Sequence, residues 1–255
     1  MARKKRRSIP RALLTIFLLL CFLSVAIYYA IEFLTTPPRI IYPAFGIYIP
    51  EGYSIHGIDV SHYQHVINWS DVKQMQVKNI KVGFVFIKAT EGIGKMDASF
   101  RRNWLQAKEK KIPKGAYHYF VSGKNGKAQA QNFIDIVELE KGDLPPVLDI
   151  EQANGNEVND VRTEAAIWLN KIEQHYKIKP IIYTNIDFYN NYLNENFEQY
   201  PFWIAHYLQP IKPRTDRKWI FWQHSEKGHV NGIKSTVDFN VFAGDSAAFK
   251  ELLIK

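Results

Sequence analysis

Residues 145–151 read PPVLDIE, an apolar run that ends in two carboxylates, Asp149 and Glu151, with one isoleucine between them. A short run rich in apolar and β-branched residues, bounded by proline, is typical of a buried strand. Carboxylates are expensive to bury, so a buried strand rarely ends in two of them unless they are paired or functional. The sheet that contains this strand therefore decides what the two acids face.

Seven other runs also have the character of strands, and amphipathic helical stretches lie between the first five runs. Alternation of strand and helix is typical of parallel sheets, and eight such strands predict an α/β fold, a TIM-like (β/α) barrel with fewer helices in its last third. A doubly wound open sheet is the alternative, although no glycine-rich phosphate loop follows any strand. The predicted strands are 57–61, 82–90, 115–120, 146–151, 180–185, 202–207, 219–225 and 236–242, and the predicted helices are 70–79, 97–111, 127–141 and 160–176.

The N-terminus carries a basic cluster followed by 20 uncharged residues, 12–31, which is the length of a membrane-spanning helix. A cleavable signal peptide has a shorter apolar core and a small-residue cleavage site, which this segment lacks. We therefore predict a basic cytoplasmic tail (1–11), an uncleaved transmembrane signal anchor (12–34), a linker leading into the domain (35–55) and a catalytic domain (56–255). The domain is expected outside the cytoplasm, in the periplasm or at the cell surface. Cys21, the one cysteine, lies within the anchor.

The net charge of +8 belongs mostly to the N-terminal segment. Residues 1–39 hold seven basic residues and one acidic residue, which leaves 26 basic and 24 acidic residues from residue 40 onward. A nearly neutral domain argues against nucleic-acid binding.

Four acids are expected at one end of the barrel, because the sites of such barrels lie at the carboxyl ends of the strands. Asp149 and Glu151 point to the same side of their strand, roughly 6 to 7 Å apart. Asp59 comes late in the first strand and Asp238 lies in the eighth, which is its neighbour if the barrel closes. Close carboxylates raise one another's pKa, which produces the general acid and the ionised partner that glycoside cleavage needs. A strand-end cap and a solvated acid remain the simpler interpretation of an isolated Asp-x-Glu.

Aromatic residues near the strand ends are candidates for stacking on sugar rings. We assign substrate binding to Tyr117, Tyr119, Tyr183, Trp203 and Tyr207. Core packing is the commoner role for any one of the aromatic residues. His56, His62 and His65 cluster around the first strand, but their spacing fits no zinc pattern, so no metal and no cofactor is predicted.

Eight motifs in order resemble family 25 glycoside hydrolases, the muramidase type of lysozyme, over about residues 56–245. They are GIDVSHYQ, FVFIKATEG, GAYHYF, PPVLDIE, IIYTN, FWIAHY, FWQHS and GIKSTVDFNVF. The one departure within these motifs is His224, where the family often has tyrosine.

The resemblance implies a flattened, irregular barrel that cuts the β-1,4 bond between N-acetylmuramic acid and N-acetylglucosamine in peptidoglycan glycan strands. It implies Glu151 as the general acid, Asp149 beside the acetamido group of the substrate, and Asp59 and Asp238 in electrostatic roles. It also implies that Gln223 lines the groove and binds substrate, and it implies retaining chemistry assisted by the acetamido group. The protein is expected to be a monomer. A non-catalytic peptidoglycan-binding barrel and a hydrolase of another N-acetylhexosamine polymer, such as chitin, remain alternatives.

Overall fold

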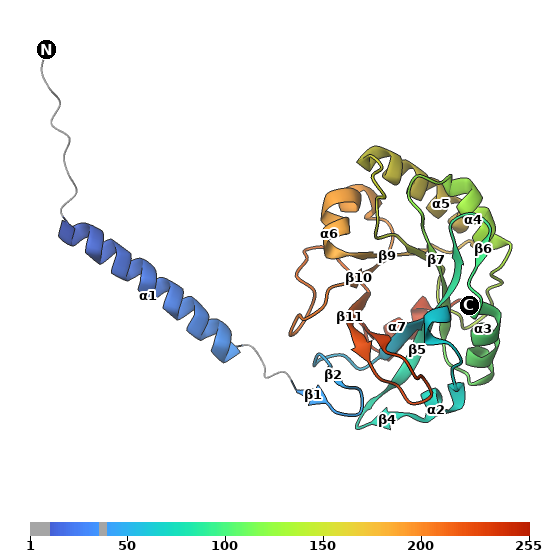
Figure 1. Ribbon diagram of the computed structural model, residues 1–255, viewed down its shortest axis with the longest axis horizontal. Helices are drawn as coiled ribbons and strands as arrows, with labels where there is room; N and C mark the ends of the chain where they lie inside the picture. Colours follow the sequence, from blue (N-terminus) through green and yellow to red (C-terminus); the bar gives the residue numbers. More distant parts are fainter. Residues whose placement is uncertain (1–10, 36–39) are drawn as a thin grey trace, which may run out of the picture. The chain divides into compact units, whose positions relative to one another are not determined.

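The computed structural model describes residues 11–35 and 40–255, and the chain divides into one unit up to residue 39 and a second over residues 40–255 (Figure 1). Residues 1–10 of the predicted basic tail and residues 36–39 of the predicted linker lie outside the described residues.

The first unit is the single helix α1 (Arg11–Thr35), which has 25 residues. At 1.5 Å per residue it is about 37 Å long, more than the hydrocarbon thickness of about 30 Å. Its apolar part, Ala12–Ile31, has a mean hydropathy of 2.5, and none of it is buried. The helix is thus long and apolar enough to cross a membrane, a property that an N-terminal signal sequence shares.

The second unit is built on a closed barrel of eight strands. Strand β3 pairs with β12 on one side and with β5 on the other, so the sheet returns to its first strand and has no open edge. The predicted barrel is confirmed, and the open doubly wound sheet is excluded. Around the barrel the order is β3 (His56–Val60), β12 (Val237–Phe242), β11 (Phe221–Gly228), β10 (Phe202–Ala205), β9 (Ile181–Asn185), β8 (Val147–Asp149), β7 (Lys114–Tyr119) and β5 (Ile80–Glu91).

Strand β12 is the only barrel strand in the described residues that runs antiparallel to its neighbours, since β11 and β12 form a hairpin. The other barrel strands are parallel. No long helix separates the last three strands, as predicted from the sequence, and only short helical turns lie between β9 and β10. These turns are α6 (Ile186–Phe188), a π-helical turn (Tyr189–Leu193) and a 3₁₀ turn (Asn194–Phe197).

The outer helices overlap the predicted ranges (Figure 1); the first three end earlier than the sequence indicates, and the fourth ends at Tyr176 as predicted. The predicted helix over 70–79 was wrong in its second half, because Val77 pairs with Ile80 in a tight hairpin. Lys78 takes a positive φ of 57° in that turn, which a helix cannot accommodate. The helices are α2 (Trp69–Gln74), α3 (Phe100–Glu109), α4 (Gly126–Ile134), α5 (Val158–Tyr176) and α7 (Ser246–Leu252), and the short strands are β1 (Ile41–Tyr42), β2 (Ile47–Tyr48), β4 (Gln76–Val77) and β6 (Lys95–Met96).

Two apolar cores support the barrel from outside and inside. The outer core fills the layer between strands and helices, and residues 45–49 of the N-terminal hairpin also contribute to it through Phe45, Ile47 and Ile49. The inner core contains the rings of Phe84 and Phe86, among other aromatic residues. Glycines make room for both rings: a Cβ on Gly57 would lie 2.4 Å from Phe84, and one on Gly115 would lie 2.6 Å from Phe86. These rings close the barrel, so a site at its mouth has an apolar floor.

Candidate active site

The strand ends bring the four predicted acids to one pocket of about 200 Å³. Asp149 is the last residue of β8, and Glu151 follows two positions later, just beyond the strand. Asp59 lies one residue before the end of β3. Because β12 runs antiparallel, its start lies at the same end of the barrel, and Asp238 pairs directly with Asp59. Sequentially distant acids therefore share one mouth.

Nine of the ten predicted site residues line this pocket. The tenth, Tyr207, is not among the lining residues. Its hydroxyl donates a 2.6 Å hydrogen bond to Gln223, which does line the pocket. The lining residues are Asp59, Val60, Ser61, Tyr63, Gln64, Lys88, Tyr117, Tyr119, Asp149, Glu151, Tyr183, Trp203, Gln223 and Asp238.

Backbone pairing fixes the end of β8, where the chain leaves the barrel wall. Asp149 lies between Tyr119 on β7 and Tyr183 on β9 in the register of the sheet. The Asp149 carbonyl accepts from Phe120 N at 2.8 Å, and Ile150 N donates to the Tyr183 carbonyl at 3.0 Å. The carboxylate of Asp149 is therefore placed between two phenol rings by the sheet itself.

A hydrogen-bond network orients Asp59. Its Oδ2 accepts from Asn240 Nδ2 at 2.7 Å and from Gln223 Nε2 at 2.9 Å. Each amide is itself held through its oxygen: Trp203 Nε1 donates to Asn240 at 2.8 Å, and the hydroxyls of Tyr183 and Tyr207 donate to Gln223 at 2.9 and 2.6 Å. The amide orientations are thus determined, and both present N–H groups to Asp59.

Asp59 and Asp238 share one proton in this arrangement. Burial raises the pKa of Asp59, whereas hydrogen bonds from Asn240, Gln223 and Asp238 oppose the rise. Burial and the negative charge of Asp59 raise the pKa of Asp238 to about 9. Asp238 is therefore protonated at neutral pH, and its carboxyl group can donate to Asp59, since two close carboxylates resist ionising together.

Asp149 and Glu151 form the second close pair, and burial raises the pKa of each. For Asp149 the negative charge of Glu151 adds to the rise, and Lys88 opposes it. For Glu151 the charge of Asp59 adds to the rise, and the neighbouring Tyr183 hydroxyl and the charge of Lys88 oppose it. Asp149 Oδ1 is buried and has no hydrogen-bond partner among the described residues. Such an acceptor is costly, and a ligand N–H is a natural partner for it.

Lys88 brings a positive charge to the pocket wall. Its side chain is mostly buried, and Nζ lies 2.7 Å from Glu91 Oε2 and 4.6 Å from the ring centroid of Tyr119. Its charge counteracts the rise in pKa of both Asp149 and Glu151. The lysine therefore limits the electrostatic repulsion among the acids.

Lys88, Asn240 and Tyr63 are among the site residues that sequence reasoning missed. A lysine inside the apolar run FVFIKAT was a usable signal, because a charged residue in a buried strand needs a partner. Asn240 gave no such signal, since its role depends on the register between β12 and β3.

Two histidines of the strand motifs, His118 in β7 and His206 directly after β10, lie outside the mouth. His118 is fully buried between Thr90 and Gln129, and burial lowers its pKa to about 3. His206 Nδ1 accepts from the backbone N of Arg214 at 3.1 Å. Neither residue lines the acid pocket.

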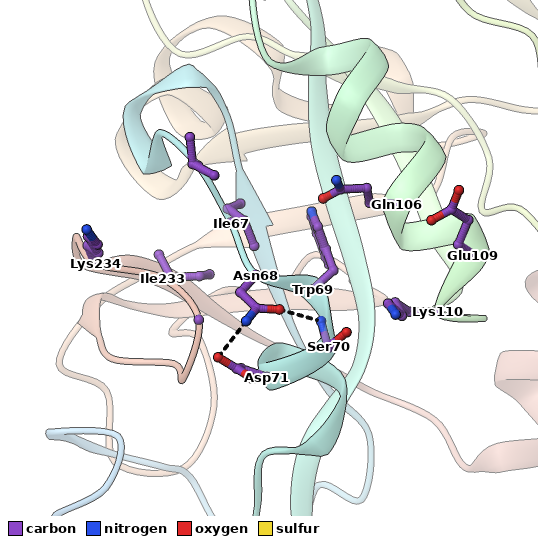
Figure 2. A pocket seen from close by; sticks show the side chains of 12 residues that line it. Ile67, Asn68, Trp69, Ser70, Asp71, Gln106, Glu109, Lys110, Ile233 and Lys234 are labelled. Carbon is purple, nitrogen blue, oxygen red and sulfur yellow. Dashed lines mark hydrogen bonds between the residues drawn. The ribbon is translucent and has the colours of Figure 1, made fainter.

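A larger hollow of about 760 Å³ lies on the outer side of the barrel, between the start of α2, the end of α3 and residues 232–234 (Figure 2). Figure 2 shows that Asn68 uses its side chain locally, because it accepts from Ser70 N and donates to Asp71. None of the four mouth acids reaches this hollow. The smaller acid pocket is therefore the candidate active site.

Comparison with known proteins gives concordant matches for the barrel unit. Residues 58–233 match the family described as glycosyl hydrolases family 25. YegX of Escherichia coli strain K12 is 43% identical over 201 residues, which cover 79% of this chain and 74% of that protein. Lysozyme M1 of Streptomyces globisporus is 35% identical over 212 residues, which cover 76% of this chain and 69% of that protein.

A solved structure has the same fold. The family 25 glycosyl hydrolase from Bacillus anthracis superposes with a TM-score of 0.74 at 33% sequence identity. The match covers 81% of this chain and 97% of that structure.

Proposed function

Because the chain belongs to glycosyl hydrolases family 25, we propose that it is a lysozyme of the muramidase type that hydrolyses the glycan strands of peptidoglycan. The chain is a glycoside hydrolase by its family. The bond we assign to it is the β-1,4 bond between N-acetylmuramic acid and N-acetylglucosamine. The observation that carries this proposal is the buried acid pair, Asp149 and Glu151, with one carboxylate oxygen left without a partner.

Glu151 is the general acid in this proposal. Burial raises its pKa, which keeps a proton on it at a pH where an exposed glutamate is ionised. Glu151 gives this proton to the glycosidic oxygen while the bond from that oxygen to the sugar C1 breaks. The acetamido oxygen of the same sugar attacks C1 and forms an oxazolinium ring. Water then opens the ring at C1 and returns a proton to Glu151, with net retention of configuration.

Asp149 holds the acetamido group during these steps. In the free protein, burial and the nearby Glu151 raise the pKa of Asp149 well above its ordinary value. An acetamido N–H donated to Asp149 Oδ1 stabilises the ionised form and lowers that pKa again. The pair then keeps its proton on Glu151, where the leaving oxygen needs it. Asp59 and Asp238 supply a fixed negative charge on the opposite side of the pocket.

The aromatic residues and Gln223 complete the substrate site. Tyr117, Tyr119, Tyr183 and Trp203 line the pocket. Tyr119 is the most exposed of the four and is the ring we assign to the face of a sugar ring, whereas Trp203 is stacked on Phe86 and supports the floor of the site. Tyr207 acts through Gln223, because the Tyr207 hydroxyl donates a hydrogen bond to the side-chain oxygen of Gln223. We assign no metal or other cofactor to this chemistry and treat the enzyme as a monomer.

The helix α1 serves as an uncleaved signal anchor in this proposal. It has the length and hydropathy of a membrane span, and the basic cluster before it favours a cytoplasmic N-terminus. The barrel then lies outside the cytoplasm, where peptidoglycan is found.

The decisive experiment incubates the full-length chain in mild detergent with purified peptidoglycan and identifies the new reducing ends by mass spectrometry. Reducing ends of N-acetylmuramic acid support the proposal. Reducing ends of N-acetylglucosamine contradict it. Binding without new ends indicates the non-catalytic barrel, and cleavage of chitin alone indicates a different N-acetylhexosamine polymer.

A further inference from the structure

Tyr63 is a large aromatic residue at the rim of the acid pocket. It lines the pocket, yet 69% of the residue is exposed. Exposed aromatic residues scattered over a surface need no explanation, but one beside a polar site marks a place where a ligand is held. The pocket itself, at about 200 Å³, is smaller than sites that enclose a drug-sized ligand. A polymer bound there must continue past its rim.

The turn that presents Tyr63 is fixed at both ends. It is the 3₁₀ turn His62–Gln64, directly after β3. Ser61 Oγ accepts from Tyr63 N at 3.2 Å, and Gln64 Oε1 accepts from Ser61 N at 2.8 Å. Gln64 Nε2 also donates to the carbonyl of Thr236 at 3.2 Å. The backbone that carries Tyr63 is therefore held by the barrel, which reduces the entropy lost when a ligand binds to the ring.

His62 backs the Tyr63 ring. The two ring centroids are 4.2 Å apart, with planes inclined at 34°. Asp97 holds the imidazole: its Oδ2 lies 2.6 Å from His62 Nδ1 and accepts from His62 N at 3.1 Å. The Asp97 side chain is 1% exposed, whereas that of His62 is 39% exposed. The Nε2 atom of His62 makes no hydrogen bond within the described residues and remains available.

We propose that Tyr63 and His62 form a subsite for one more hexosamine ring of the glycan strand, outside the two sugars joined by the cleaved bond. The subsite rests on the proposed function for the identity of its ligand. The apolar C–H face of a pyranose packs on the exposed tyrosine ring, and the Nε2 atom of His62 hydrogen-bonds to a hydroxyl at the edge of the sugar. The subsite thus adds affinity for long strands and leaves the chemistry unchanged.

Steady-state kinetics of Tyr63→Ala in the full-length chain tests this subsite. On long glycan strands we expect KM to rise about tenfold, which corresponds to about 1.4 kcal/mol, with kcat within about twofold of the wild type. The variant Tyr63→Trp keeps an aromatic face and should restore the low KM. Leu105→Ala removes a similarly exposed apolar side chain from α3 and should change nothing. A single N-acetylmuramic acid with a chromogenic leaving group fills only the two positions joined by the cleaved bond and cannot reach the subsite, so Tyr63→Ala should process it normally.

Two results overturn the subsite: an equal loss on long and short substrates, or a loss confined to kcat. A measurement of binding to glycan strands distinguishes failure of the subsite from failure of the proposed function. If the wild-type chain cuts no peptidoglycan, the proposed function fails, and co-sedimentation with purified glycan strands then tests the subsite alone. Binding weakened about tenfold by Tyr63→Ala and restored by Tyr63→Trp supports it, and unchanged binding overturns it.

Discussion

The two acid pairs of the pocket differ in how completely the protein satisfies them. Asp59 receives two amide N–H groups on one oxygen, and Asp238 donates to it when protonated. Asp149 Oδ1 has no partner among the described residues, although it is equally enclosed. The protein completes the first pair and leaves the second incomplete.

This difference indicates that the Asp59–Asp238 pair has a structural role and that the Asp149–Glu151 pair acts on the substrate. A buried acceptor without a partner costs about 1 to 3 kcal/mol, and at the mouth of the barrel a ligand can supply the missing partner. The satisfied pair provides a fixed charge and needs no substrate to hold its geometry. Substitutions in the two pairs should therefore have different consequences, and the following predictions test that contrast.

The largest effect is expected from Glu151→Gln. The amide keeps the shape of the side chain but has no acidic proton for the leaving oxygen, so kcat should fall about 10³-fold, within the range known for general acids. Binding of glycan strands should remain. Turnover of peptidoglycan and co-sedimentation measure the two properties. The matched control is Glu109→Gln on the exposed surface of α3, and full activity in Glu151→Gln would remove our assignment of the acid.

Asp149→Asn should lower kcat about 10²-fold and should also stabilise the fold. The neutral amide cannot support positive charge on the acetamido group, but it removes a buried carboxylate whose pKa is raised well above the ordinary value. We expect a Tm gain of about 2 to 4 °C at pH 7, corresponding to about 1 kcal/mol. Thermal denaturation and turnover measure the pair of effects. A loss of both activity and stability would indicate that Asp149 belongs to the structural pair instead.

Asn240→Ala should affect the pH dependence rather than abolish activity. It removes one of the two amide donors that favour ionised Asp59, so the pKa of Asp59 rises further. We expect kcat/KM to fall about tenfold and the acid limb of its pH profile to move to higher pH. Asn191→Ala, which removes an exposed amide bonded to the backbone of Asp187, is the control. An unchanged acid limb would show that Asp59 does not need this orientation.

The smallest effect is a pH-dependent gain in stability from Asp238→Asn. The folded-state pKa of Asp238, about 9, lies above its ordinary value of 3.8. Between these pH values the folded state keeps a proton that the unfolded chain has lost, so the stability of the wild type falls as pH rises. Asparagine removes this dependence. The Tm difference between variant and wild type should be near zero at pH 4 and reach about 3 °C at pH 9. A constant difference would contradict the raised pKa.

The sequence was sufficient to predict the barrel because its strands are separated by strong helical patterns. The same pattern located Asp149 and Asp59 at strand ends, and closure placed Asp238 beside Asp59. Periodicity could not reveal the partners of these acids. The bonds from Asn240 and Gln223 to Asp59 depend on the register of strands that lie more than 160 residues from it in the sequence. The early end of α2 was equally hidden, because the hairpin at Lys78 competes with a plausible helix.

The anomeric configuration of the first sugar released tests most directly whether Asp149 and Glu151 promote attack by the acetamido group of the substrate. Proton NMR recorded during early turnover of a soluble glycan fragment distinguishes the two anomers before they equilibrate. The proposed double displacement predicts the β anomer as the first product. The α anomer would contradict it, because Asp149 would then activate water for a single displacement instead of holding the acetamido group.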